Sequence, residues 1–293
     1  MNNNNYIDAH FDKNLKKVVV WERTDEGRKT VYHDAPFYFY VPDEDKRFNP
    51  RLGVIDGERC AYTSMYNTKL TKIKFRNGFE LSEEAKDTRV KFESDIGPVE
   101  RVLMTEYYGR GAPKIHTAFL DIEVDYDREL GFSSPENPYA PVNAITIYLT
   151  WADEYITIGV PPKGFDWSTL DTTLPSNVVL VKTEKELLEM TLDIMEDVDL
   201  VSGWNSEFFD LPYLIKRTER ALGPSAVQRW CFPEAPGPTW SEQEKFDQKR
   251  LVLRSSVVST LTIFSSSRSS RSVVALPTRW VTSPKKNCQT CRS

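Results

Sequence analysis

Two carboxylates stand two residues apart near the end of an apolar segment, in Asp121-Ile122-Glu123. Residues i and i+2 of a β-strand point to the same side of the sheet, so both side chains would share one face. Adjacent carboxylates repel each other and need a cation or a proton, and hard oxygen ligands suit Mg²⁺ or Mn²⁺. The pattern therefore predicts either a metal site or an ordinary solvated strand edge.

A third carboxylate, Asp210, lies in the polar and aromatic segment from Asn205 to Tyr213. Pro212 falls in the first turn of the helix expected here, where proline is tolerated. Asp210 is then either an ordinary helix N-cap or a side chain that leans from the helix entrance over the strand bearing Asp121 and Glu123. In the second case the three carboxylates meet.

These side chains need a sheet and helices to position them, and the pattern from residue 113 onward predicts both. Apolar and β-branched runs predict strands at residues 115–124, 143–151, 155–160, 178–181 and 199–202. Apolar residues at helical spacing predict helices at residues 184–198 and 211–222. Strands and helices in this order indicate a mixed sheet covered by helices, in the α/β (α+β) class.

The N-terminal part of the chain is predicted to be β-rich. Short aromatic or β-branched runs predict strands at residues 17–21, 29–32 and 37–41, with a hairpin turn at 24–27. A later run, residues 71–76, alternates polar and apolar residues and places Lys72, Lys74 and Arg76 on one face. That face either contacts the phosphates of a nucleic acid or simply meets water.

Charge is distributed unevenly along the chain. The 293 residues include 38 Lys plus Arg and 43 Asp plus Glu, a net charge of −5. Residues 251–293 hold seven of the basic residues and no acidic one, so the composition changes at residue 250. The acidic balance excludes a globally basic nucleic-acid coat but leaves room for a local basic groove. Because neither a membrane-spanning run nor a signal peptide is recognisable, we expect a cytoplasmic protein with no membrane partner.

Two segments together resemble a known family. Phe119-Leu120-Asp121-Ile122-Glu123-Val124, followed by Asn205 to Leu214, is similar to the first two exonuclease motifs of family B DNA polymerases, most of all in the tailed-phage, T-even-like branch. The order of segments agrees, because a β-rich N-terminal part precedes both motifs. The resemblance implies an RNase H-like 3′→5′ proofreading exonuclease fold that serves DNA replication, in the host cytoplasm if the source is a phage.

The resemblance also implies roles for individual residues. Two divalent ions, Mg²⁺ or Mn²⁺, would share Asp121, with Glu123 on the ion that holds the attacking water and Asp210 on the other. The substrate would be the single-stranded 3′ end of DNA. Asn205 and Phe209 would place that end, since aromatic stacking is a sequence-tolerant grip. From the residues alone, loop capping by Asn205 and core packing by Phe209 stay open.

One family feature is missing from the chain. The third motif, Tyr-x-x-x-Asp, is absent, because no tyrosine follows Tyr213 and Asp247 is the one aspartate after Asp210. The polymerase palm is missing too. We therefore expect weak or no exonuclease activity from this chain alone, and no DNA synthesis unless a separate polymerase-core chain supplies the rest. A frameshift or premature end near residue 250 would explain the change in composition, the alternative being a genuine basic extension that binds nucleic acid.

Three parts are expected along the chain. They are a β-rich domain at residues 1–112, an incomplete RNase H-like exonuclease domain at 113–250, and a basic Ser/Arg-rich tail at 251–293 that is disordered or non-native. The competing functional hypothesis is a module that binds single-stranded nucleic acid without cutting it, through the face formed by Lys72, Lys74 and Arg76. A truncated, poorly folded product with neither activity is the third.

Overall fold

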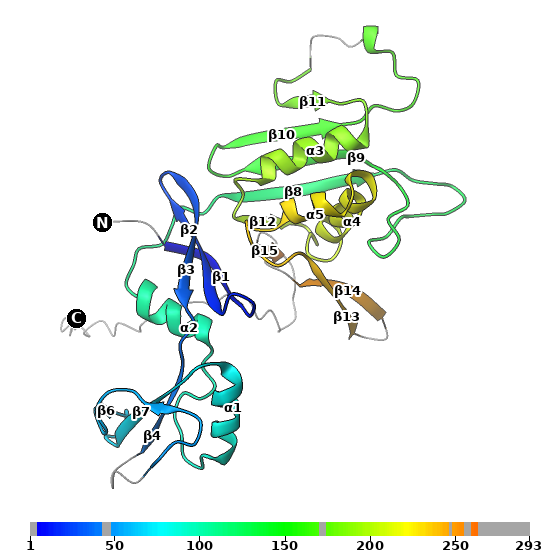
Figure 1. Ribbon diagram of the computed structural model, residues 1–293. Helices are drawn as coiled ribbons and strands as arrows, with labels where there is room; N and C mark the ends of the chain where they lie inside the picture. The colour runs from blue at the N-terminus through cyan, green and yellow to red at the C-terminus, as the bar shows by residue number, and fades with distance from the viewer. Residues whose placement is uncertain (1–4, 43–47, 170–173, 246–247, 255–258, 263–293) are drawn as a thin grey trace, which may run out of the picture. The chain divides into compact units, whose positions relative to one another are not determined.

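The chain folds into a mixed α/β structure with a β-rich N-terminal part, which confirms the predicted fold class (Figure 1). The computed structural model describes residues 5–42, 48–169, 174–245, 248–254 and 259–262, and all of these belong to one compact unit. Most of the tail predicted at residues 251–293 lies outside the described residues. Among the described residues, no helix combines the length and apolar character needed to cross a membrane.

Two small antiparallel sheets form the N-terminal part. The first contains β1 (Asn5–Asp12), β2 (Lys17–Thr24) and β3 (Gly27–Asp34), in that order. The second contains β4 (Phe37–Pro42), β5 (Val54–Ile55), β6 (Tyr62–Thr63) and β7 (Lys69–Phe75). Helices α1 (Gly78–Asp87) and α2 (Pro98–Val102) follow, and α2 runs on into a π-helical turn (Leu103–Tyr107). The predicted hairpin turn is present, because Thr24 pairs with Gly27 where β2 meets β3.

A six-stranded mixed sheet carries the exonuclease-like motifs. Its strands are β8 (Thr117–Val124), β9 (Val142–Leu149), β10 (Glu154–Gly159), β11 (Val178–Leu180), β12 (Leu200–Gly203) and β15 (Ser259–Thr262). They lie in the order β11-β10-β9-β8-β12-β15. The β8–β9 and β9–β10 pairs are antiparallel, whereas β12 is parallel to both β8 and β15. The two central strands of this sheet are therefore β9 and β8, and β8 holds the paired carboxylates.

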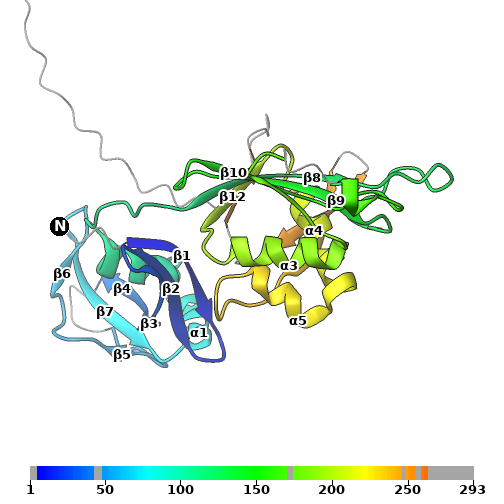
Figure 2. The ribbon, with the colours of Figure 1, turned by 90° about the horizontal axis from the view of Figure 1, so that it is seen from above.

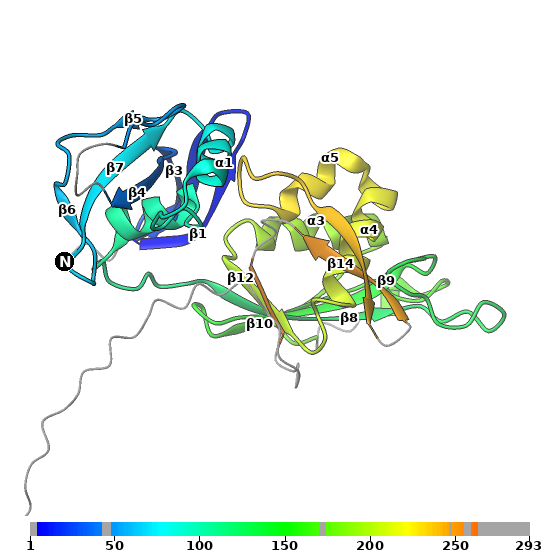
Figure 3. The same ribbon diagram turned by 90° about the horizontal axis from the view of Figure 1, so that it is seen from below.

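Helices pack against one side of the sheet. They are α3 (Glu184–Met195), α4 (Asp210–Leu222) and the short α5 (Pro224–Val227), with 3-10 turns at Trp167–Thr169 and Gln228–Trp230. Figures 2 and 3 show α3 and α4 on the same side of β8 and β9. Ala118, Leu120 and Ile122 are buried toward the core that these helices complete. The alternate residues of β8 consequently face the opposite side.

Two details differ from the sequence-based boundaries. A hairpin of β13 (Thr239–Lys245) and β14 (Gln248–Arg254) crosses residue 250, and β15 lies beyond it. The boundary predicted at residue 250 thus falls inside a strand, because backbone pairing continues where the composition changes. Helix α4 begins at Asp210 rather than at residue 211, and its N-cap is Phe209. The ordinary N-cap role considered for Asp210 is therefore wrong.

The N-terminal three-stranded sheet shares a core with the six-stranded sheet. Val19 and Trp21 of β2 belong to the same buried cluster as the apolar residues of β8, α3 and α4. The Trp21 ring stacks on Phe232 with centroids 5.0 Å apart, and its indole N–H donates to the carbonyl oxygen of Pro233 at 2.9 Å. A Trp that buries its ring and also satisfies its N–H is a strong anchor between two parts of a fold.

Candidate active site

Strand β8 presents Asp121 and Glu123 on its solvent-facing side. Burial alternates along the strand, so Phe119, Asp121 and Glu123 are exposed while the residues between them are buried. The predicted sharing of one face by the two carboxylates is confirmed at the level of the strand. The buried residues Ala118, Leu120 and Ile122 fix the register of β8. A slip by one residue would expose these apolar side chains and bury the carboxylates.

Gly203 lets the end of β12 pass close to β8. A Cβ atom at this position would lie 2.4 Å from the carbonyl oxygen of Leu120, and 3.1 Å from the Cβ of Ser206. The 2.4 Å contact with a backbone oxygen is too short for a real Cβ atom, so glycine fits here without a shift of either strand. The next turn contains Asn205 at φ +58°, a left-handed conformation that asparagine tolerates. Together the two residues turn the chain sharply from β12 toward α4.

Asp210 is buried at the start of α4, with 4% of its surface exposed. Its carboxylate accepts hydrogen bonds from backbone N–H groups of Asp210 itself and of Ile122 in β8. Burial, followed by the nearby negative charge of Asp121, raises the pKa of Asp210 from 3.8 to about 7. The helix entrance therefore brings the Asp210 carboxylate against the strand that bears Asp121.

The rest of α4 is held by buried polar contacts. The Tyr213 hydroxyl donates to the carbonyl oxygen of Ala140 at 2.7 Å, and a 2.8 Å hydrogen bond joins it to the hydroxyl of Ser133. The Arg217 guanidinium makes a two-pronged ion pair with Glu184, the first residue of α3. Because a bidentate Arg–carboxylate pair fixes both direction and distance, it keeps α4 in one position along the sheet.

The structure brings together two of the three predicted carboxylates. Asp121 and Asp210 interact electrostatically, while Glu123 lies two residues further along the same exposed side of β8. Within the described ranges, no group of three His, Cys, Asp or Glu side chains lies close enough to hold a metal ion. Asp121 and Asp210 are thus brought near each other, and the meeting of all three carboxylates at one metal site stays a prediction.

A groove of about 600 Å³ opens beside Asp121. Phe119, Tyr148, Tyr155 and Trp204 are the aromatic residues among those that line it. The rings of Tyr148 and Tyr155 stack with centroids 4.5 Å apart, and Trp204 is 69% exposed. None of these four residues was predicted as a site residue from the sequence. Phe119, Tyr148 and Tyr155 lie in the adjacent strands β8, β9 and β10, and only the pairing of β9 with both neighbours brings their rings to one face.

Asn205 and Phe209 have structural roles in the described fold. The carbonyl oxygen of Asn205 accepts from the backbone N–H groups of Phe208 and Phe209, each at 3.0 Å. Phe209 packs against the main core and stacks on Tyr213 with centroids 5.5 Å apart. The backbone of Asn205 thus holds the turn and Phe209 packs in the core, and a role of either side chain in placing DNA stays a prediction.

The three basic residues near β7 have different surroundings. Lys72 forms a 2.8 Å ion pair with Asp56, and its ammonium group lies 4.2 Å from the centroid of the Tyr38 ring. Arg76 follows β7 and donates to Glu80 at the start of α1. Lys74 is exposed on the outer side of β7. Two of the three cations thus already have carboxylate partners, which lowers the net positive charge of the predicted phosphate-binding face.

Comparison with known proteins identifies the family. The sequence model of a protein family, the exonuclease domain of DNA polymerase family B, matches residues 64–234, which is more than half of the chain. The chain belongs to the family B exonuclease domain. A DNA-directed DNA polymerase of Escherichia phage RB69 is 29% identical over 137 residues, covering 40% of this chain and 15% of that protein. The DNA polymerase delta catalytic subunit of Caenorhabditis elegans is 27% identical over 143 residues, covering 47% of this chain and 13% of the relative.

The carboxylate pair of this family B exonuclease domain suits a divalent cation. Asp121 and Asp210 are hard oxygen donors, and burial of Asp210, followed by the negative charge of Asp121, raises the pKa of the Asp210 carboxyl. A divalent ion would compensate the negative charge of the pair, as Mg²⁺ and Mn²⁺ prefer carboxylate oxygens. Glu123 is the next carboxylate on the same side of β8 and is exposed. The residues present therefore fit a divalent-metal site centred on Asp121.

Proposed function

We propose that this chain is the N-terminal and 3′→5′ exonuclease part of a family B DNA polymerase, acting on the single-stranded 3′ end of DNA. The observation that carries the proposal is the approach of the buried Asp210 carboxylate to Asp121. A protein without a cation to bind gains nothing from burying one carboxylate beside another, because both desolvation and repulsion oppose it. In an exonuclease site the same two carboxylates bind a divalent cation, which offsets both costs.

The residues have separable roles in this proposal. Asp121, Glu123 and Asp210 hold the metal, with Mg²⁺ or Mn²⁺ as the ion. The bound ion supplies Lewis-acid activation of water and stabilisation of the leaving 3′ oxygen. The Ile122 N–H, by donating to Asp210, orients that carboxylate toward Asp121. Asn205 and Phe209 shape the turn that delivers Asp210 to the strand.

The proposal extends to the finer assignments. The branch is the tailed-phage, T-even-like one, and the β-rich N-terminal domain ends at residue 112. No Tyr-x-x-x-Asp pattern follows Asp210 in the printed sequence, and a separate polymerase-core chain is a candidate partner that would supply one. Reading the gene in its other frames downstream of residue 250 tests the frameshift hypothesis, which fails if neither frame encodes that pattern.

The decisive experiment uses a 5′-labelled single-stranded oligonucleotide and the full chain. Incubation with Mn²⁺ or Mg²⁺ should shorten the labelled oligonucleotide stepwise from its 3′ end, slowly because the Tyr-x-x-x-Asp pattern is absent. EDTA should stop the shortening. Asp121→Ala and Glu123→Ala should each abolish shortening. A blocked 3′ terminus separates this activity from a contaminating endonuclease, which would still cut.

A matched control keeps the result specific. Asp95→Ala removes an exposed carboxylate from the N-terminal part and should leave the rate unchanged. Shortening that persists in Asp121→Ala, or that is equal with and without metal, contradicts the proposal. Complete inactivity of the wild-type chain, combined with absence of Mn²⁺ binding by calorimetry, contradicts it as well.

The second candidate is retention of single-stranded nucleic acid without cutting. Lys74 favours it, because this exposed cation pairs across the sheet with Tyr38, which places a charge and a ring side by side. Binding of the intact oligonucleotide should then weaken steeply with salt. Lys74→Ala should reduce the salt slope by about 1, whereas Arg76→Ala, at a cation already bonded to Glu80, should change it less.

A further inference from the structure

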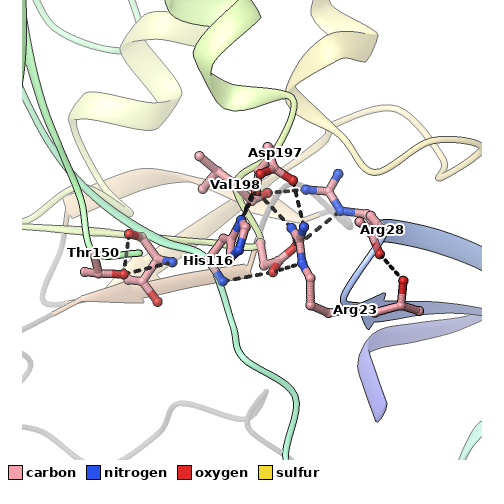
Figure 4. Close-up of polar contacts among 10 residues, drawn as sticks. Arg23, Arg28, His116, Thr150, Asp197 and Val198 are labelled. Carbon is pink, nitrogen blue, oxygen red and sulfur yellow. Dashed lines mark hydrogen bonds and ion pairs between the residues drawn. The ribbon is translucent and has the colours of Figure 1, made fainter. Parts of the chain in front are cut away.

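A buried ion network joins the N-terminal hairpin to the two strands of the active site. Asp199, which is fully buried, directly precedes β12. Arg23 of β2 donates to both of its carboxylate oxygens, through Nε at 2.7 Å and Nη2 at 2.5 Å. Arg28 of β3 donates from Nε to Asp199 at 3.2 Å, and from Nη2 to the Val198 carbonyl oxygen at 2.6 Å (Figure 4).

The same carboxylate also fixes the start of β8. Its Oδ2 atom accepts from the backbone N–H of His116 at 3.0 Å, and the Asp199 N–H donates back to the His116 carbonyl oxygen at 2.8 Å. The imidazole of His116 lies 2.9 Å from the Asp197 carboxylate and stacks on Trp151 with centroids 4.4 Å apart. Figure 4 shows His116 and Arg23 on either side of Asp197. Asp199 thus holds β8 and β12 together at one end.

Charge within the network is balanced. Arg23 contacts the carboxylates of Asp197 and Asp199, and Arg28 contacts Asp199, so two cations meet two anions. Arg23 is 4% exposed, and the guanidinium of Arg28 also lies 4.8 Å from the Phe232 ring centroid. A buried pair of this kind adds little net stability over an apolar replacement, but it specifies one geometry because each of the three guanidinium nitrogens of Arg23 has a partner.

That geometry reaches the catalytic carboxylates. The parallel register pairs Leu200 with Thr117 and Ser202 with Phe119, so an anchor at Asp199 sets how far β12 runs beside β8. Asp121 lies two residues beyond the last of these pairs, and the chain leaving β12 delivers Asp210 to the N–H of Ile122. Changing the anchor would shift one carboxylate relative to the other.

We propose that Arg23 and Asp199 are positioning residues, which set the distance between Asp121 and Asp210 from the far end of β8 and β12. This proposal rests on the proposed exonuclease site for its purpose, but it makes a claim about geometry that holds without metal. It also assigns the N-terminal hairpin a part in the exonuclease site, since both arginines come from β2 and β3.

The experiment compares Arg23→Lys with Arg229→Lys in the full chain. Arg229 is the matched control, because it likewise bonds two carboxylates, those of Asp193 and Glu196, but touches neither strand. The first readout is the ¹H–¹⁵N resonance of the Ile122 amide in EDTA. Asp210→Asn is the reference for a protein in which the hydrogen bond from the Ile122 N–H to the Asp210 carboxylate is disturbed. The second is Mn²⁺ affinity by calorimetry. Circular dichroism verifies folding of each variant.

We expect Arg23→Lys to shift the Ile122 amide toward the Asp210→Asn position and to weaken Mn²⁺ binding by up to about tenfold, the lower end of what loss of a direct partner of a metal ligand costs. Arg229→Lys should change neither. A folded Arg23→Lys protein with an unmoved Ile122 amide overturns the proposal. If the wild-type chain binds no Mn²⁺, the exonuclease function fails, while the Ile122 amide still decides whether the anchor positions Asp210.

A second substitution guards against loss of folding. Arg28→Lys leaves the Arg23 fork in place and should produce a smaller shift of the same amide in the same direction. If both lysine variants unfold while Arg229→Lys stays folded, the network acts in overall stability and the positioning role is refuted.

Discussion

The carboxylate of Asp210 lies close enough to that of Asp121 for the two charges to repel each other. Three segments distant in sequence create this relationship: strand β8, the tight turn after β12 and the first turn of α4. The N–H of Ile122 partly offsets the cost by donating to Asp210. Because the two carboxylates repel each other without a cation and a bound cation would neutralise them, the unfolding free energy should depend on pH and on divalent metal.

Stability should fall as pH rises toward neutrality in the metal-free protein. The pKa of Asp210 is about 7 in the folded chain against an ordinary 3.8, so between these values the folded state holds a proton that the unfolded state has released. The unfolding free energy contributed by Asp210 is therefore full below pH 4 and is lost as pH approaches 7. Asp210→Asn should remove this slope and stabilise the protein at pH 8 by about 2–4 kcal/mol.

Urea unfolding in EDTA at pH 4, 5.5, 7 and 8 measures the effect. Asp95→Asn is the control, because it removes an exposed carboxylate with the same chemistry, and its curve should parallel the wild type. Equal pH slopes for wild type and Asp210→Asn would show that the Asp210 carboxyl is ionised normally in the folded chain.

Divalent metal should stabilise the wild-type protein and not the carboxylate variants. A ligand that binds the folded state alone adds about 2.7 kcal/mol at 100 times its dissociation constant. Thermal melts with increasing Mn²⁺ should therefore rise for wild type, rise less for Glu123→Gln, and stay flat for Asp121→Asn. A matching rise in Asp121→Asn would place the bound ion elsewhere on the protein.

Alanine at Gly203 should damage the site through sterics alone. The added methyl would overlap the Leu120 carbonyl oxygen, so β12 or β8 must move, at a cost of about 1–3 kcal/mol. Gly159→Ala is a suitable comparison, since its Cβ would meet mainly the end of the Leu180 side chain, at 3.3 Å. Urea unfolding should show a clear loss for the first variant and a small change for the second.

Tyr213→Phe should loosen the loop that precedes β9. The substitution keeps the ring but removes the bonds to Ser133 and the Ala140 carbonyl oxygen, costing about 1–3 kcal/mol for the buried acceptor left without its donor. Hydrogen exchange of the Ala140 amide should accelerate. Tyr126→Phe, at a tyrosine 58% exposed, should alter neither stability nor exchange.

The sequence alone was sufficient for the strand that bears Asp121 and Glu123, for the main helices beside it and for the family. The pattern in residues 115–124 predicts a strand with Asp121 and Glu123 on one side, because a two-residue period is a local property of the chain. The helical spacing in residues 184–198 predicts a helix for the same reason, and α3 covers residues 184–195 of it. Motif spacing then indicated the family that the comparison establishes for residues 64–234. Strand and helix periodicity and motif spacing are all properties of short segments, so they can be predicted without knowledge of the tertiary contacts.

Other features depended on which segments meet in space. The composition suggested a boundary at residue 250, yet β14 crosses it, since strand pairing is set by partner backbone groups and not by charge. Sequence also left Asp210 between a capping role and a metal role. The hydrogen bond of Asp210 with Ile122, its repulsion by Asp121 and the ion pair of Arg23 with Asp199 all join residues from separate elements. No local sequence pattern predicts such contacts.

The types of carboxylate and their places on strand or helix could thus be read from the chain itself. Their charge state could not, because desolvation and the Asp121 charge act on Asp210 only after β8, β12 and α4 have packed. Contacts such as that between Gly203 and Leu120 are likewise properties of packing, in which one missing Cβ determines whether two strands can approach.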